Sequence, residues 1–121
     1  MMTEAEWQEQ VIELAHLLGW EHMHVRRSIG KGSKWTTATN VSGWPDLTLW
    51  SERHRMLLFV ELKSDIGKLT PDQNEVHRSL QAAGQAVLVW RPADLPAVQR
   101  VLTFPRAWMS DGVTEFVEVD L

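Results

Sequence analysis

One run of seven residues constrains the fold of this chain more than any other part of its sequence. Residues 57–63 read LLFVELK, and successive side chains of a strand point to opposite faces of its sheet. One face would carry Leu58, Val60 and Leu62, and the other would carry Leu57, Phe59, Glu61 and Lys63. Because apolar side chains occur on both faces, the run predicts a central strand in a sheet that is covered on both sides.

Helical patterns before and after this run supply the layers that such a sheet needs. Residues 3–18 predict a helix, because Thr3 and Glu6 form a capping-box pattern and apolar residues recur at spacings of three, four and seven. Thr70 and Gln73 form a second capping-box pattern, which predicts a helix that ends near Gly84. A third helix is predicted at residues 93–102.

Shorter apolar runs predict the remaining strands, at residues 20–26, 46–50 and 86–90. Residues 28–43 are rich in Gly, Ser, Thr and Lys and predict a loop, and within the tail only residues 114–119 indicate an edge strand. The predicted order is α-β-β-β-α-β-α. We therefore expect an α/β fold, a restriction-endonuclease-like mixed sheet flanked by helices.

Length and composition are those of one domain. The chain has 121 residues, 44% of them hydrophobic, and no cysteine, so it can bury a core without disulfides. Its polar start is unlike a secretory signal, and no apolar run approaches the roughly 18 residues of a membrane span. We expect a single domain over residues 1–121, with its core at residues 4–102, in a cytoplasmic protein without a membrane partner.

A hairpin would bring two carboxylates together at one end of the central strand. In a symmetrical hairpin Trp50 pairs with Leu57. The same register sets Asp46 opposite Glu61, on the face that also carries Lys63. Two carboxylates about 5 Å apart repel by roughly 3 kcal/mol at an effective dielectric near 20. Lys63 and a divalent cation would offset this repulsion, and carboxylate oxygens favour Mg²⁺ or Mn²⁺ over zinc.

These groups suit phosphodiester hydrolysis. A metal ion held by Asp46 and Glu61 would polarise a phosphodiester and activate a water molecule. Lys63 would position that water or stabilise the charge that develops. The alternative is that Glu61 and Lys63 form an ordinary exposed pair on the strand.

The motifs around these residues resemble a known nuclease signature. Gly43-Trp44-Pro45-Asp46 followed by Glu61-Leu62-Lys63 is similar to the PD-(D/E)xK pattern, and more narrowly to the VRR-NUC family of phage and repair nucleases. The likeness continues through residues 11–15, 18–20, 69–73 and 89–92. It implies a restriction-endonuclease-like core, dependence on Mg²⁺ or Mn²⁺, and DNA substrates. Stand-alone members are similar to Holliday-junction resolvases and act as homodimers.

The resemblance also implies roles for particular residues. Asp46 and Glu61 would be metal ligands together with the backbone carbonyl of Leu62, and Lys63 would be the catalytic lysine. The family also has a glutamate on the first helix and a glutamine after the lysine strand.

Glu4 and Gln73 are the candidates for these two further catalytic positions. Glu4 lies within about 20° of the centre of the apolar stripe on the first helix, so it can point at the sheet as a metal ligand. The alternative is a first-turn carboxylate that stabilises the helix dipole. Gln73 shares a helix face with Val76 and Leu80, and its alternative role is the capping box with Thr70.

Basic residues that would contact DNA phosphates are few. The candidates are Arg26, Arg27, Lys31, Lys34 and Lys68, and a solvated loop is the alternative. The formal net charge of −4 argues mildly against tight binding to duplex DNA.

The histidines carry a weaker signal. His22 and His24 alternate on one strand and would need a third ligand to bind zinc, which the sequence does not indicate. We expect His16, His54 and His77 to be ordinary surface or boundary residues.

Three functions fit these observations. The leading hypothesis is a structure-specific endonuclease for branched DNA, such as four-way junctions, in a phage or bacterial host cytosol. The second is a non-catalytic DNA-binding or adaptor module on a nuclease fold, and the third is a nuclease that acts on flaps, ends or duplex DNA.

Overall fold

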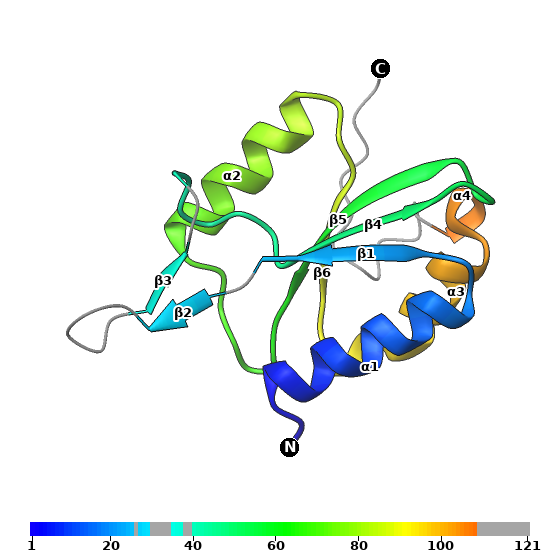
Figure 1. The fold of residues 1–121 in the computed structure, drawn as a ribbon, viewed down its shortest axis with the longest axis horizontal. Coiled ribbons are helices and arrows are strands. Elements are labelled where there is room, and N and C mark those ends of the chain that lie inside the picture. The colour runs from blue at the N-terminus through cyan, green and yellow to red at the C-terminus, as the bar shows by residue number, and fades with distance from the viewer. Residues whose placement is uncertain (26, 30–34, 38–39, 109–121) are drawn as a thin grey trace.

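The centre of the molecule is a four-stranded mixed sheet (Figure 1). The computed structural model describes residues 1–25, 27–29, 35–37 and 40–108. The strands β1 (Glu21–His24), β4 (Leu47–Ser51), β5 (Met56–Leu62) and β6 (Val87–Trp90) are hydrogen-bonded in that order. The pairs β1–β4 and β4–β5 are antiparallel, whereas β5 and β6 are parallel. The strand that carries Glu61 is therefore interior, as its two-sided apolar pattern predicts.

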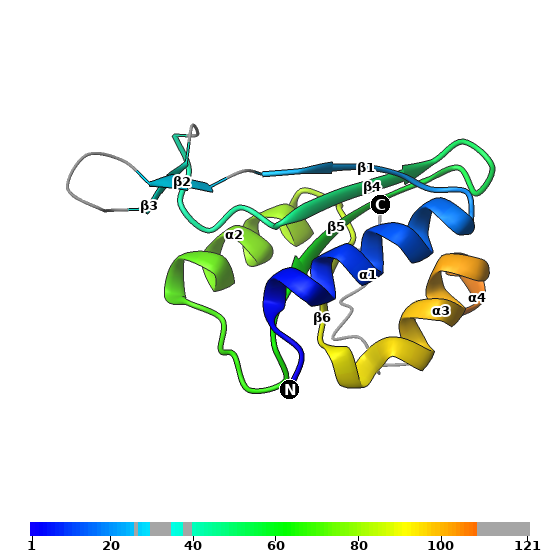
Figure 2. The same cartoon turned by 60° about the horizontal axis from the view of Figure 1, so that its bottom comes forward.

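Helices cover both faces of this sheet, which confirms the predicted fold class. The helices are α1 (Glu4–Leu17), α2 (Pro71–Ala82), α3 (Leu95–Thr103) and the short α4 (Pro105–Trp108), with a 3₁₀ turn, η1 (Pro92–Asp94), before α3. In Figure 1, α1 and α2 lie on opposite sides of the sheet, and Figure 2 shows α3 next to α1 on the same side. Both predicted capping boxes form, at Thr3 with Glu6 and at Thr70 with Gln73. No helix in the described part of the chain is long and apolar enough to cross a membrane.

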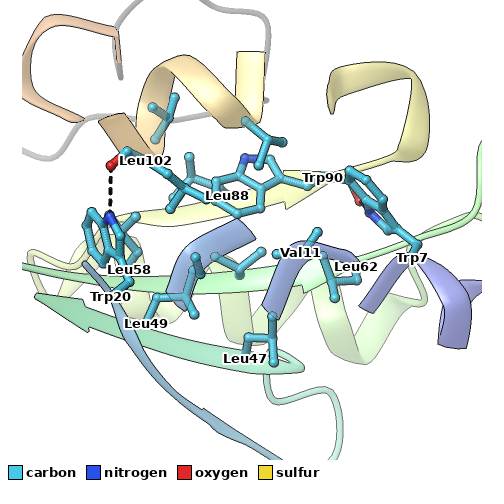
Figure 3. Close-up of a cluster of buried hydrophobic side chains, with 14 residues drawn as sticks. Trp7, Val11, Trp20, Leu47, Leu49, Leu58, Leu62, Leu88, Trp90 and Leu102 are labelled. Carbon is cyan, nitrogen blue, oxygen red and sulfur yellow. Dashed lines mark hydrogen bonds between the residues drawn. The ribbon is translucent and has the colours of Figure 1, made fainter. Parts of the chain in front are cut away.

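The apolar core lies between the sheet and the helices α1 and α3 (Figure 3). It buries alternate residues of the strands, including Leu49, Leu58 and Val60, against Trp7 and Val11 of α1. Tryptophans at the edge of the core also satisfy backbone carbonyls. The core cluster consists of Trp7, Val11, Ala15, Trp20, Leu47, Leu49, Leu58, Val60, Leu62, Leu88, Trp90, Val98, Val101 and Leu102.

The indole groups of Trp7 and Trp20 connect segments that are distant in the sequence through buried hydrogen bonds. The indole nitrogen of Trp20 donates to the carbonyl of Leu102 at 2.8 Å, which joins the start of β1 to the end of α3. The indole nitrogen of Trp7 donates to the carbonyl of Trp90 at 3.0 Å, which joins the first turns of α1 to the end of β6. Because a buried polar group must be paired, these bonds determine how the helices sit against the sheet.

The prediction of a loop over residues 28–43 is wrong for two short segments. β2 (Arg27–Ile29) and β3 (Trp35–Thr37) pair antiparallel in a separate two-stranded sheet. Strands of three residues are too short to show an alternating pattern, so the sequence offers no periodic signal for them. The edge strand expected at residues 114–119 lies outside the described residues.

Gly43 lets the segment before β4 approach the first turn of α2 closely. Its φ is +92°, in the region that favours glycine. A Cβ atom at Gly43 would lie 2.5 Å from the carbonyl carbon of Asp72 and 2.7 Å from the amide nitrogen of Gln73. Only a residue without a side chain allows this contact, so Gly43 seats α2 beside the segment that leads to Asp46.

Replacing Gly43 by alanine should therefore destabilise the protein strongly. The matched control is Gly19→Ala, because Gly19 has a similar φ of +89° but its Cβ would meet only the Arg53 side chain at 3.5 Å. Both variants incur the cost of a left-handed alanine, and only Gly43→Ala adds a clash with backbone. We expect Gly43→Ala to lose about 1–3 kcal/mol more unfolding free energy than the control, measured by urea denaturation. Equal losses would show that the contact with α2 is unimportant.

Candidate active site

Asp46 lies where the β4–β5 hairpin ends, and its side chain is held by the backbone. The last pair in the ladder is Leu47 with Val60, and Trp50 pairs with Leu57, which is the register predicted from the sequence. The next pair of positions along the two strands is Asp46 and Glu61. One carboxylate oxygen of Asp46 accepts a hydrogen bond from the amide of Leu62 at 2.8 Å. This hydrogen bond joins the two strands beyond the last backbone pair of the ladder, and it orients the Asp46 carboxylate.

Glu61 is fully buried on β5, with an exposed fraction of 0%. It shares a sheet face with Asp46, since both lie one residue beyond the inward-pointing pair of Leu47 and Val60. Opposed residues in an antiparallel pair have Cβ atoms about 5 Å apart, so two ionised carboxylates here would repel by roughly 3 kcal/mol. Burial at that separation requires compensating positive charge or hydrogen-bond donors.

One such donor comes from α2. The Nε2 atom of His77 lies 3.2 Å from Oε1 of Glu61, and the exposed fraction of His77 is 7%. Expecting His77 to be a surface or boundary residue is therefore wrong. It lies four residues after Gln73 on the same helix face, and this i,i+4 spacing is the signal in the sequence that would have found it.

Lys63 follows Glu61 by two residues and so points to the same side of the sheet. It is buried at 9% exposure, and its amide donates to the carbonyl of Trp90 at 3.1 Å. That carbonyl also accepts the indole hydrogen bond of Trp7. The Trp90 carbonyl thus joins β5, β6 and α1 beside Lys63, and the exposed-pair alternative for Glu61 and Lys63 does not fit their burial.

The turn after Lys63 is braced by Arg91. The guanidinium of Arg91 donates to the carbonyl of Ser64 at 2.8 Å and also to the carbonyl of Gly67. A Cβ atom at Gly67 would lie 3.5 Å from Cδ of Lys63, so the lysine side chain passes close to this turn. The brace fixes the backbone turn that the Lys63 side chain passes.

The carboxylate pair fits a hard divalent cation better than zinc. Among the residues that the structure describes, no group of three or more His, Asp and Glu side chains is placed to hold a metal ion. The chain has no cysteine. Magnesium ions are bound by one or two carboxylates and keep several waters, whereas structural zinc needs four protein ligands. Asp46 and Glu61, with the Leu62 carbonyl as the further oxygen that the family resemblance implies, would be a donor set of the first kind.

Comparison with known proteins identifies the family of this chain. The VRR-NUC domain profile matches residues 2–94. This chain belongs to the VRR-NUC family. A solved structure described as a VRR-NUC domain is 25% identical, covers 85% of this chain and 98% of its own, and superposes with a TM-score of 0.59. A comparison with curated proteins found no match. VRR-NUC proteins are nucleases that act on DNA and are generally dependent on divalent metal ions.

The first helix of this VRR-NUC domain reaches the site at its N-terminal end. Glu4 begins α1, and Trp7, one turn later, is bonded to the Trp90 carbonyl that also holds the Lys63 amide. The helix that carries Glu4 is thus fastened at the end of the sheet where Glu61 and Lys63 lie. The Glu4 side chain itself is exposed, so its role as a metal ligand stays a prediction.

Gln73 serves as a helix cap and also lies at the site. Its Oε1 accepts from the Thr70 amide at 2.9 Å, and its own amide donates to the Thr70 hydroxyl at 3.1 Å. It is 96% buried next to Gly43, at the start of the segment that leads to Asp46. The capping box occupies the carbonyl oxygen of the side chain. The predicted cap is confirmed, and a catalytic role for Gln73 stays a prediction.

The predicted DNA contacts are placed only in part. Arg26, Lys31 and Lys34 lie outside the described residues, and of Arg27 only the backbone, in β2, is described. Lys68 is exposed on the connection between β5 and α2. Trp44, in the variable position of the Gly-x-Pro-Asp motif, packs edge-on against Phe59 with ring centroids 5.8 Å apart.

Three histidines form a cluster away from the carboxylates, at the other end of α1. Nε2 of His16 lies 2.8 Å from Nδ1 of His22, and the rings of His22 and His24 stack at 5.6 Å between centroids. A surface hollow of about 420 Å³ beside this cluster is lined by Glu13, His16 and Leu17 and contains neither acid of the site. The cluster does not form a metal site among the described residues.

His22 should make the fold sensitive to acid. Burial lowers the pKa of His22 below its ordinary value, and the neighbouring His16 and His24 lower it further. As the pH falls below about 6.5, the unfolded chain takes up a proton that the folded protein resists, so stability is lost toward the lower pKa. The variant His22→Gln should lose less unfolding free energy than the wild type between about pH 7 and pH 5. Urea denaturation at several pH values tests this, and parallel pH profiles would contradict it.

Proposed function

We propose that this protein is a Mg²⁺- or Mn²⁺-dependent endonuclease that cleaves branched DNA, such as four-way junctions, and works as a homodimer in the cytoplasm. The observation that carries the proposal is the end of the β4–β5 hairpin. There Asp46 and Glu61 occupy opposed positions, and the buried Lys63 lies two residues along on the same side. Two acids and a lysine gathered in this way have a cost in stability that a purely structural role would not explain.

Asp46 and Glu61 would hold the divalent ion, with the Leu62 carbonyl and Glu4 as further oxygen donors. When bound, such an ion polarises the scissile phosphodiester and lowers the pKa of water. The hydrogen bond from the Leu62 amide keeps Asp46 pointed across the hairpin end before any ion arrives. Preorganised ligands of this kind spend little of the binding energy on their own ordering.

Lys63 would act on the reacting groups themselves. Its ammonium carries donors that can hold the attacking water or stabilise the negative charge that develops on the phosphate oxygens. Lys63 lies directly after β5, beside the turn that Arg91 braces through the carbonyls of Ser64 and Gly67. Lys68 and the basic residues of the β2–β3 region would bind flanking phosphates.

The number of sites supports a homodimer. Among the described residues the proposed constellation occurs once, and resolving a four-way junction requires two symmetric cuts. A two-fold dimer places two identical sites on one substrate. The preference for branched DNA over flaps, ends or duplex is supported by the likeness to stand-alone members of the family.

Removing Lys63 should abolish cleavage without abolishing metal binding. Transition-state stabilisation by a single charged donor is worth about 10²–10³ in rate, so Lys63→Ala should lose at least that factor. Cleavage of labelled junction, flap, single-stranded and duplex substrates with Mg²⁺ or Mn²⁺ measures the loss and the substrate preference together. The matched control is Arg78→Ala, which removes an exposed cation of α2 that is paired with Glu75.

Replacing Asp46 by asparagine should remove metal binding and leave the fold intact. Asparagine can still accept the Leu62 hydrogen bond, and it relieves the repulsion with Glu61. We expect Asp46→Asn to fold at least as stably as the wild type in EDTA. A ligand that binds the folded state stabilises it. Added Mn²⁺ should therefore raise the melting temperature of the wild type but not that of the variant, which lacks one of the two carboxylates that would bind the ion. An equal rise in both proteins would remove Asp46 from the metal site.

A second candidate function is a DNA-binding adaptor without catalysis. The observation that favours it is the complete burial of Glu61 against His77, which gives this carboxylate a partner within the protein. The two functions give opposite outcomes with Asp46→Asn. If the protein is an adaptor, the Asp46→Asn variant should bind DNA as tightly as the wild type, and neither the variant nor the wild type should cleave any substrate of the panel.

A further inference from the structure

The face that α2 turns toward the sheet is polar. Helices that pack on a sheet ordinarily bury an apolar stripe. The buried residues of α2 are instead Gln73 and His77, one turn apart, whereas Val76 and Leu80 are half-buried. Burial of a polar side chain costs free energy unless it is hydrogen-bonded. The capping box uses part of Gln73, and His77 must therefore be explained by what it contacts.

What His77 contacts is the carboxylate of Glu61. Nε2 of His77 and Oε1 of Glu61 are 3.2 Å apart, and the exposed fractions of the two residues are 7% and 0%. A contact buried to this extent is shielded from solvent, so it is stronger than the same contact at the surface. The helix that presents His77 begins at a capping box, and its first turn lies against Gly43 of the segment before β4.

We propose that His77 is a positioning residue that orients Glu61 for binding the divalent ion, an inference that rests on the proposed function. The two acids are then oriented by separate donors. The backbone amide of Leu62 holds Asp46, and the imidazole of His77 holds Glu61. With its imidazole directed into the protein interior, His77 acts on the reaction through Glu61.

Because Asp46 and Glu61 have different donors, removal of the His77 side chain should change the orientation of Glu61 only. A glutamate side chain has three rotatable bonds, and a hydrogen bond to one carboxylate oxygen restricts its rotation. Partners that orient a metal ligand in this way typically change metal affinity or activity about 10–100-fold when they are removed. Loss of the His77 donor should therefore weaken the binding of the ion and leave the contacts with DNA unchanged.

The test compares four variants with the wild type. His77→Leu keeps the bulk and removes the donor, and His77→Gln keeps an amide donor near the place of Nε2. His77→Asn also carries an amide but is one carbon too short. The matched control is His16→Leu, which removes an exposed histidine at the far end of α1. Binding of Mn²⁺ is followed by electron paramagnetic resonance, folding by thermal melting, and junction cleavage by kcat and KM at several Mn²⁺ concentrations.

We expect His77→Leu to bind Mn²⁺ about 10–100-fold more weakly than the wild type. Its kcat should fall at low Mn²⁺ and recover as Mn²⁺ is raised, with the KM for DNA unchanged. His77→Gln should keep most of the affinity, and His16→Leu should keep all of it. If His77→Leu does not fold, the comparison of His77→Gln with His77→Asn tests the same donor.

Two results would overturn the inference while the proposed function stands. One is a folded His77→Leu protein that binds Mn²⁺ as tightly as the wild type. The other is a loss in His77→Gln as large as that in the donor-free or shortened variant, which would assign the effect to packing. A wild-type protein that binds no Mn²⁺ and cleaves no DNA would overturn the proposed function and the inference together.

Discussion

The pairing of β4 with β5 is the constraint on which the rest of the site depends. Side chains alternate along a strand, so a slip of one residue in this register would turn Asp46 away from Glu61 and move Leu47 and Leu49 out of the core. Burial of the apolar face therefore fixes the polar face as well. The hydrophobic effect is not directional, but by fixing the strand register it also determines where the two carboxylates lie relative to each other.

Hydrogen bonds from several elements meet at the carboxyl end of β5, and two of them reach the carboxylates. Leu62 donates its amide to Asp46, His77 of α2 contacts Glu61, and the carbonyl of Trp90 accepts from both Lys63 and Trp7. Each bond joins a different element to the same end of β5. The end of the central strand is thus the place where α1, α2 and β6 meet.

Much of this could be predicted because the interactions are local in sequence or follow a simple period. The capping boxes at Thr3 and Thr70 each span four residues, and the two-sided apolar pattern of residues 57–63 predicted the interior strand. The register of a short hairpin follows from its turn, so Trp50 opposite Leu57 could be counted from the sequence. β2 and β3 could not be foreseen, because three paired residues carry no period and form only when both segments are brought together.

Local pattern alone was sufficient for the three longer helices, the interior strand, and the opposed positions of Asp46 and Glu61, but it did not predict the short α4. The partner of Glu61 required the folded chain, because His77 lies sixteen residues away on another element and its role depends on how α2 is seated. That seat depends in turn on the bare backbone of Gly43 against Asp72 and on the polar face of the helix. Strand alternation and helix capping involve residues that are close in the sequence, so both produce patterns that can be recognised there. The packing of α2 on the sheet depends on contacts between segments that are far apart in the sequence, and no sequence pattern relates those segments.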